Sequence, residues 1–302
     1  MFATLNSCTD RFQTVPYQRG PMRKPIITLL TDFGTKDHYV ASMKGVILSI
    51  NPQCLLIDIT HQVNPHDIQE GAFILANTYS YFPKGTIHLS VVDPGVGGKR
   101  KPILLVTQNY LFVGPDNGLF TLVAQRDKVK QVLVLTKQKY FLPKVSMTFH
   151  GRDIFAPVVA HLSLGIKPHA FGHEIDSFEE LGFEKPIIKD GKLLGEVLHI
   201  DTFGNLVSNV DEEKLFRFIQ GRPFVIRAGR ETIHCLKKGY WEGRRGEPIA
   251  LLGSSGFLEI AVREGNAQKV LKVKKGDRIW VEHSVQGIGH RVTNKSIIEK
   301  TC

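Results

Sequence analysis

The chain has 302 residues, of which 42% are hydrophobic and 23% are charged. This composition is typical of a globular protein with one large or two smaller domains, and no apolar run approaches the roughly 18 residues that a membrane helix needs. The formal net charge is +10, of which residues 1–24 contribute +3 and residues 287–302 contribute +2. The remainder is thinly spread apart from a basic group within residues 237–245. Because no RNA-binding aromatic motif accompanies that group, we do not expect nucleic-acid binding.

The N-terminal residues and the cysteines bear on the cellular compartment of the protein. Residues 1–24 have no apolar segment of the kind that a secretory signal carries. We expect a flexible extension there, with Met22 as an alternative start and a transit peptide as the less favoured interpretation. The four cysteines are scattered, with no Cys-x-x-Cys pair, which argues against a disulfide framework and a zinc site. We therefore predict a cytoplasmic protein.

Strands and helices alternate in the first half of the chain. Residues 38–50 carry apolar side chains at helical spacing, a second helix is predicted to begin at Asn64-Pro65, and a later one near Gly151. This order predicts an α/β domain over residues 25–187, with a mainly parallel sheet covered by helices. The predicted strands are residues 26–30, 54–59, 87–92 and 103–107.

The pattern changes from about Gly191. Short alternating runs are separated by glycine, asparagine and aspartate turns, which is typical of a small all-β barrel or sandwich. We predict such a domain over residues 190–286, followed by a tail at 287–302. The predicted strands are residues 195–200, 223–228, 232–236, 248–252, 258–262 and 278–282.

Polar residues follow the first three predicted strands, at the sheet edge where ligands bind in such folds. The third of these segments begins with Asp93, continues through a Pro-Gly turn and two more glycines, and reaches Arg100. The turn could fold Arg100 back toward the Asp93 carboxylate. We predict an acid–base pair at this strand end.

Three further residues of the first domain are candidates with structural alternatives. Asp32 could accept the hydroxyls of a ribose, although alone it would be a turn residue. Asp37 could contact a substrate ammonium group or cap the helix that follows. His150 lies directly before a helix, where Asp153 could orient it or favour the positive helix end. A lone histidine is more often structural.

The second domain offers candidates within turns. Asn205 could pair with an adenine edge and Phe203 could stack on a base, but both also fit an ordinary hairpin turn with Asp201. The segments around Ser254 and Ala267 offer hydroxyls and backbone amides and are turn-like when taken singly. In the first domain, His61 and His66 have weak spacing for metal ligands, and we predict no metal.

Together these segments resemble the S-adenosyl-L-methionine (SAM) hydroxide adenosyltransferase family, whose relatives include SAM-dependent chlorinases and fluorinases. The match extends over roughly residues 26–283, and the order and number of its short motifs make it specific. The matching segments are Thr31–Gly34, Asp58–His61, Asp93–Gly97, Pro115–Gly118, Phe149–Asp153, Phe203–Asn205 and Ser254–Gly256.

The resemblance implies an N-terminal α/β domain, a C-terminal β-barrel and a homotrimer, with active sites between the N-domain of one subunit and the C-domain of its neighbour. It implies a small-molecule substrate, SAM, with no cofactor and no membrane partner. Asp93, Arg100 and His150 would activate water. The implied substrate-binding residues are Asp32 at the ribose, Phe203, Asn205 and Ala267 at adenine, and Asp37, Asp201 and Ser254 near methionine.

The resemblance therefore implies a SAM hydrolase that forms adenosine and L-methionine. In this hypothesis Asp93 and His150 take a proton from water while Arg100 holds the developing hydroxide in line with C5′. The alternatives are a SAM-dependent halogenase and a protein that binds adenosyl compounds without chemistry. The halogenating relatives lack the aspartate and histidine of this set, so their presence here favours hydrolysis.

Overall fold

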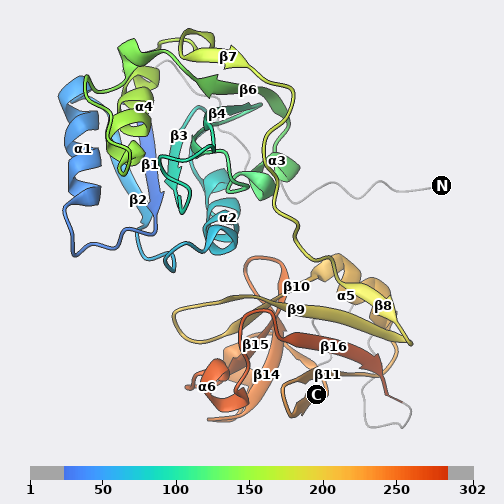
Figure 1. Ribbon diagram of the computed structural model, residues 1–302. Coiled ribbons are helices and arrows are strands. Elements are labelled where there is room, and N and C mark those ends of the chain that lie inside the picture. Colours follow the sequence, from blue (N-terminus) through green and yellow to red (C-terminus); the bar gives the residue numbers. More distant parts are fainter. Residues whose placement is uncertain (1–23, 285–302) are drawn as a thin grey trace, which may run out of the picture. The chain divides into compact units, whose positions relative to one another are not determined.

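The computed structural model describes residues 24–284 (Figure 1). These residues form two compact units. The first comprises the described chain up to His66, with Tyr81–Asp116 and Ala124–Phe178, and the second comprises Asp67–Ser80, Asn117–Val123 and the chain from Glu179. The predicted extension, apart from Lys24, the predicted tail and Met22 lie outside the described residues.

The first unit is built on a seven-stranded sheet in the order β2-β1-β3-β5-β4-β6-β7. Strands β2, β1, β3 and β5 are parallel, whereas β4, β6 and β7 join antiparallel. The α/β prediction is confirmed, but β4 is antiparallel to β5 because only three residues link them, too few for a parallel crossover. The strands are Ile26–Thr31, Leu55–Thr60, Ile87–Val91, Pro102–Thr107, Leu111–Pro115, Val129–Leu135 and Gly172–Glu174 for β1 to β7.

Two helices pack together on this sheet, α1 (Tyr39–Ile50) and α4 (Ala156–Ser163), and are seen side by side in Figure 1. Met43 of α1 and Val158 of α4 are buried in one hydrophobic core with the strands. The apolar spacing of both segments predicts these helices. A short helix, α3 (Thr121–Arg126), lies between β5 and β6. One π-helical turn at Gly151–Phe155 leads directly into α4.

Helix α2 (Ile68–Ala76) differs from its prediction in two respects. Its N-cap is Asp67, whose side chain accepts the Glu70 amide at 2.9 Å, rather than Asn64. The preceding residue, His66, has a left-handed backbone with φ of 67°, so the helix does not extend back to Asn64. The helix also belongs to the second unit, where Phe73 stacks on His199 with ring centroids 5.0 Å apart.

The second unit is built on a nine-stranded curled sheet, which confirms the barrel-like prediction (Figure 1). It also contains α5 (Glu212–Ile219) and α6 (Ala267–Leu271). Its core includes Val197, Leu215, Ile226 and Ile260. The strands, β8 to β16, are Ile187–Lys189, Lys192–Ile200, Leu206–Asp211, Phe224–Ala228, Glu231–Ile233, Leu236–Lys237, Pro248–Leu252, Phe257–Val262 and Arg278–His283.

Two further features concern the cysteines and the membrane. Cys54 is a buried free thiol, whereas Cys235 is disulfide-bonded, which the scattered cysteines did not predict. Among residues 24–284, no helix combines the length and the hydropathy that crossing a membrane requires.

Candidate active site

Asp93, Arg100 and His150 form one connected group in the first unit. Arg100 Nε donates to Asp93 Oδ1 at 3.0 Å and Arg100 Nη2 donates to Asp93 Oδ2 at 2.5 Å. The same Nη2 lies 2.8 Å from His150 Nδ1. The side chains of Asp93 and Arg100 are only 4% and 10% exposed. The predicted return of Arg100 to Asp93 is therefore present, and His150 joins the pair.

Glycines allow the two loops that carry this group to approach each other. Gly97 has φ of 75°, and a Cβ atom there would lie 2.1 Å from the carbonyl oxygen of Met147. A Cβ at Gly95 would lie 3.3 Å from Arg100 Cγ. At Gly97 only a residue without a side chain permits this approach, whereas a Cβ at Gly95 would require Arg100 to shift by a few tenths of an ångström. The glycines that follow Asp93 thus bring its loop against the segment that precedes His150.

The contact with Arg100 fixes the tautomer of neutral His150. A guanidinium only donates hydrogen bonds, so Nδ1 of His150 accepts and the ring proton lies on Nε2. Burial lowers the pKa of His150, the Arg100 charge lowers it further, and Asp93 and Asp153 act in the opposite direction. At neutral pH, His150 is therefore an uncharged ring whose Nε2–H is a donor.

Several aromatic side chains pack beside the group. Phe149, the neighbour of His150, contacts Phe33 with ring centroids 6.0 Å apart and Tyr39 with centroids 5.2 Å apart, both edge-to-face. The Arg100 guanidinium lies 5.5 Å from the centroid of the buried Phe155 ring. The sequence predictions assign no role to these rings. The available signal was that Phe33 directly follows Asp32 and Phe149 directly precedes His150.

Asp32 lies at the same sheet edge, because β1 and β3 are parallel neighbours. Its Oδ2 accepts the backbone amide of His66 at 2.9 Å. Asp37 is exposed and does not cap α1, since the N-cap residue is His38, which makes no side-chain capping bond. The capping alternative for Asp37 is therefore wrong.

Asp153 does not hydrogen-bond to His150. It is fully buried, and its carboxylate accepts Arg152 Nε at 2.6 Å and the Ser146 amide at 2.7 Å. Its carbonyl also accepts the Leu142 amide at 2.9 Å. Asp153 thus ties the loop before His150 to the π-helical turn after it. Such turns are frequent at functional sites.

The candidates of the second unit form a separate group on the turn between β9 and β10. Asp201 Oδ1 accepts the amides of Phe203 and Asn205 at 2.9 and 2.8 Å, and its Oδ2 accepts Asn205 Nδ2 at 2.9 Å. Both oxygens of Asp201 are therefore engaged within the turn. Asn205 is buried and oriented, whereas Phe203 is 76% exposed.

Ala267 adjoins this turn. A Cβ on Gly204 would lie 2.1 Å from Asn266 Nδ2, and the Gly204 carbonyl accepts the Gln268 amide at 2.9 Å. Ala267, at the start of α6, is thereby held beside Phe203 and Asn205. Ser254 is exposed on the turn between β14 and β15.

A buried acid near Ser254 was missed in the sequence. Glu259 of β15 accepts the Tyr240 hydroxyl at 2.6 Å, and a Cβ on Gly253 would lie 2.5 Å from its Oε2. Burial raises the pKa of Glu259, and nearby Asp201 raises it too, against the Tyr240 hydrogen bond. A single carboxylate within the apolar run from Phe257 to Val262 was the signal.

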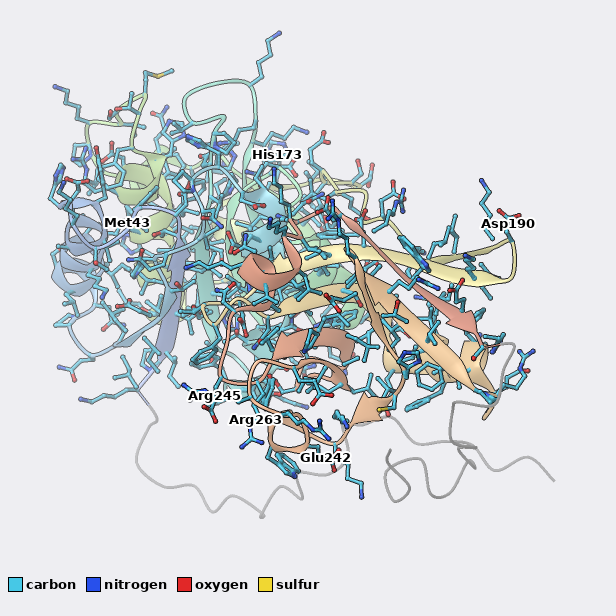
Figure 2. The ribbon with its side chains drawn as sticks, turned by 90° about the horizontal axis from the view of Figure 1, so that it is seen from below. Met43, His173, Asp190, Glu242, Arg245 and Arg263 are labelled. Carbon is cyan, nitrogen blue, oxygen red and sulfur yellow. The ribbon has the colours of Figure 1, made fainter. Side chains whose placement is uncertain are left out.

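Two other predictions concern metals and nucleic acid. Among the described residues, no three histidine, cysteine or acidic side chains are grouped as metal ligands would be. In Figure 2, Glu242, Arg245 and Arg263 lie along one edge of the second unit. Arg245 pairs with Glu264 at 3.2 Å, and Arg263 donates to the Gly243 carbonyl at 2.7 Å. Carboxylates and carbonyls thus engage part of the basic group and its neighbours.

Comparison with known proteins gives consistent matches over both units. Residues 27–172 match the model of the SAM hydroxide adenosyltransferase N-terminal domain, and residues 195–280 match that of the C-terminal domain. A protein of Methanocaldococcus jannaschii named (R)-S-adenosyl-L-methionine hydrolase is 38% identical, over 85% of this chain and 95% of its own length.

Two further relatives extend the comparison. The crystal structure of a conserved protein from Thermotoga maritima has a TM-score of 0.80 and 39% identity, covering 85% of this chain and all of its own. A fluorinase of an Actinoplanes species is 28% identical, over 78% of this chain and 90% of its own length. The hydrolase relative is thus more similar to this chain than the fluorinase.

Proposed function

The chain belongs to the SAM hydroxide adenosyltransferase family, and from this premise we propose that it hydrolyses S-adenosyl-L-methionine to adenosine and L-methionine. The observation that carries the proposal is the connected Asp93–Arg100–His150 group at the sheet edge. The name of the hydrolase relative specifies the R form of the substrate. We therefore propose the R epimer at sulfur as the preferred substrate.

In this reaction the leaving group needs no activation, whereas the nucleophile does. SAM carries a sulfonium, so methionine departs as a neutral thioether that takes the C5′–S electron pair and needs no proton. Water must lose a proton as its oxygen bonds to C5′, and general-base help is typically worth about 10²- to 10⁴-fold. The chemistry therefore calls for a base and for a positive group that favours hydroxide.

We assign these tasks to three side chains. The Nδ1 lone pair of His150 faces Arg100, so His150 donates from Nε2 rather than accepting a proton. Asp93 takes the proton from water, and the Arg100 charge stabilises the hydroxide that forms. The family resemblance led to the hypothesis that Asp93 and His150 both take the proton, whereas with this tautomer we assign His150 the orientation of the nucleophile. The proton finally passes from Asp93 to solvent.

The remaining candidates would hold the substrate. Asp32 would bind the ribose hydroxyls, while Phe203, Asn205 and Ala267 would bind adenine. Asp37 and Ser254 would lie near the methionine end. Because both oxygens of Asp201 bind its own turn, we assign Asp201 the positioning of Asn205 rather than a direct contact with methionine.

Assembly, cofactor need and compartment are part of the proposal. The candidates fall on two separate units, which fits a homotrimer whose neighbouring subunits share each active site. No cofactor or metal is needed, because the thioether leaves without electrophilic help, and dialysis against EDTA should leave turnover unchanged. The cytoplasm is the proposed compartment, against which the disulfide at Cys235 counts, and cell fractionation tests it.

Product identity tests the activity. Purified protein is incubated with each sulfur epimer of SAM, with and without chloride or fluoride, and the nucleosides are separated by chromatography. We expect adenosine, formed faster from the R epimer and absent with Asp93→Asn. A 5′-halo-adenosine product would identify a halogenase instead. Calorimetric binding of SAM with no product would identify a binding protein.

A further inference from the structure

A buried hydrogen-bond chain lies beneath the loop that carries Asp32. Thr31 Oγ1 accepts the Phe33 amide at 3.2 Å and lies 2.8 Å from His61 Nδ1. The other ring nitrogen, Nε2, makes a close polar contact with Asp58 Oδ1 at 3.0 Å that lacks the geometry of a hydrogen bond. Lys44 Nζ donates to Asp58 Oδ2 at 2.6 Å. Thr31 is fully buried and His61 nearly so. The activity proposed above uses none of these side chains.

For a neutral His61 ring, the nearby Asp58 carboxylate favours one arrangement of donors and acceptors along these contacts. A negative oxygen 3.0 Å from Nε2 favours the proton on that nitrogen, so that Nδ1 accepts the Thr31 hydroxyl proton, while Thr31 Oγ1 accepts from Phe33. Burial raises the pKa of Asp58, but the neighbouring Lys44 and His61 outweigh it and the pKa is lowered. Asp58 is thus an ionised carboxylate at the exposed end of this series of contacts.

The backbone is shaped to make this contact. Leu29 of β1 pairs with Asp58 of β2, but Leu30 pairs with Thr60, so β2 has an irregularity at Ile59. Such bulges re-aim side chains near functional sites. The Gly34 amide then donates to the His61 carbonyl at 2.7 Å, and the His66 amide donates to Asp32 Oδ2 at 2.9 Å. Two hydrogen bonds therefore hold the loop at 31–34 against the loop at 61–66.

We propose that Asp58, His61 and Thr31 are positioning residues that fix the Asp32 carboxylate for binding a ribose. This inference rests on the proposed function, which supplies the adenosyl substrate. The His66 amide engages Asp32 Oδ2 and thereby holds the carboxylate in one orientation, with Oδ1 as the oxygen for the ribose. A substitution that weakens binding equally in the ground state and the transition state raises KM and leaves kcat nearly unchanged.

The chain offers a matched control on the same strand. Thr28 Oγ1 lies 2.7 Å from His88 Nδ1, and both residues are fully buried in the middle of the sheet. Thr28→Val and Thr31→Val thus remove the same type of Thr–His hydrogen bond from β1. Only Thr31 adjoins the Asp32 loop, so a purely structural role would give both variants the same kinetics.

The experiment measures kcat, KM and thermal unfolding for Thr31→Val, Thr31→Ser, Thr28→Val and Asp58→Asn. We expect Thr31→Val to raise KM about 10-fold, the typical effect of losing one oriented hydrogen bond, with kcat within a factor of about 2. Thr31→Ser should restore KM, and Thr28→Val should leave it unchanged at a similar loss of thermal stability. Asp58→Asn, at a 40% exposed side chain, should raise KM even if Thr31→Val folds poorly.

A substrate analogue separates this inference from the proposed function. With 2′-deoxy-SAM, the ratio of KM values between Thr31→Val and wild type should shrink, because the affected hydroxyl is absent. Equal KM for Thr31→Val and Thr28→Val would overturn the positioning role while wild-type turnover upheld the function. If wild type formed no adenosine, the same variants would be compared by adenosine calorimetry, where an unchanged dissociation constant, or no binding at all, would overturn the inference.

Discussion

Arg100 is the residue on which the proposed chemistry depends, because one guanidinium meets both Asp93 and His150. We predict that His150 titrates below the ordinary histidine value of 6.5. A proton on Nδ1 would point at a guanidinium that offers no acceptor, and burial disfavours the charged ring. The loss of activity at acid pH that results from protonation of His150 should therefore occur below pH 6.5. NMR titration of the His150 ring measures the pKa directly.

Removing the positive charge provides the control for this titration. In Arg100→Met, the pKa of His150 should rise, because burial remains but the charge that opposes protonation is gone. Turnover should fall by about 10²-fold or more, since the variant also releases Asp93. An unchanged pKa in Arg100→Met, or a wild-type pKa above 6.5, would contradict the assigned tautomer.

At the scale of elements, the approach of two loops decides whether the group assembles. Gly97→Ala would place a Cβ atom 2.1 Å from the Met147 carbonyl oxygen at a backbone φ of 75°. The loops must then separate, moving Asp93 and Arg100 away from His150, and kcat should fall by about 10-fold or more. Gly85→Ala is the matched control, since Gly85 has φ of 87° but nothing within 4 Å of an added Cβ. Similar kcat values in the two variants, measured alongside their unfolding temperatures, would show that loop separation is not the cause.

The helices also show which secondary-structure elements could be predicted from the sequence. The bounds of helix α1 agree with its prediction to within a residue because apolar spacing is local information. The predicted α2 cap was wrong because His66 adopts a left-handed backbone while its amide binds Asp32, a residue 34 positions away. Helix α5 was not predicted, although the Asp211 cap and the spacing of Leu215, Phe218 and Ile219 are local signals for it.

In the candidate active site, the separation of two contacting residues along the sequence also decides whether their contact can be predicted. Asp93 and Arg100 are seven positions apart across one turn, so turn chemistry alone could predict their pairing. The contact of Arg100 with His150 spans 50 residues and required the family resemblance. The contact of Thr31 with His61 depends on the irregular pairing at Ile59, which no local pattern in the sequence indicates.

At the scale of the whole molecule, the proposed trimer makes a prediction that a monomer with self-contained sites does not. Asp93→Asn should inactivate the Asp93–Arg100–His150 group, and Phe203→Ala should impair adenine binding. If neighbouring subunits share each site, co-expression of the two variants creates some sites that take Asp93 from one subunit and Phe203 from another. Random assembly at equal amounts should restore about a quarter of the wild-type activity, because one in four pairings is intact on both sides.

Separately purified variants, mixed without exchange of subunits, serve as the control and should stay at the sum of their individual activities. Analytical ultracentrifugation of the co-expressed protein must show the same trimer as wild type for the comparison to hold. Co-expressed protein that sediments as a trimer but regains no activity would place every group of a site on one subunit. In that case the two separate groups of candidate residues, around Asp93 and around Asn205, would have to serve one substrate within a single chain.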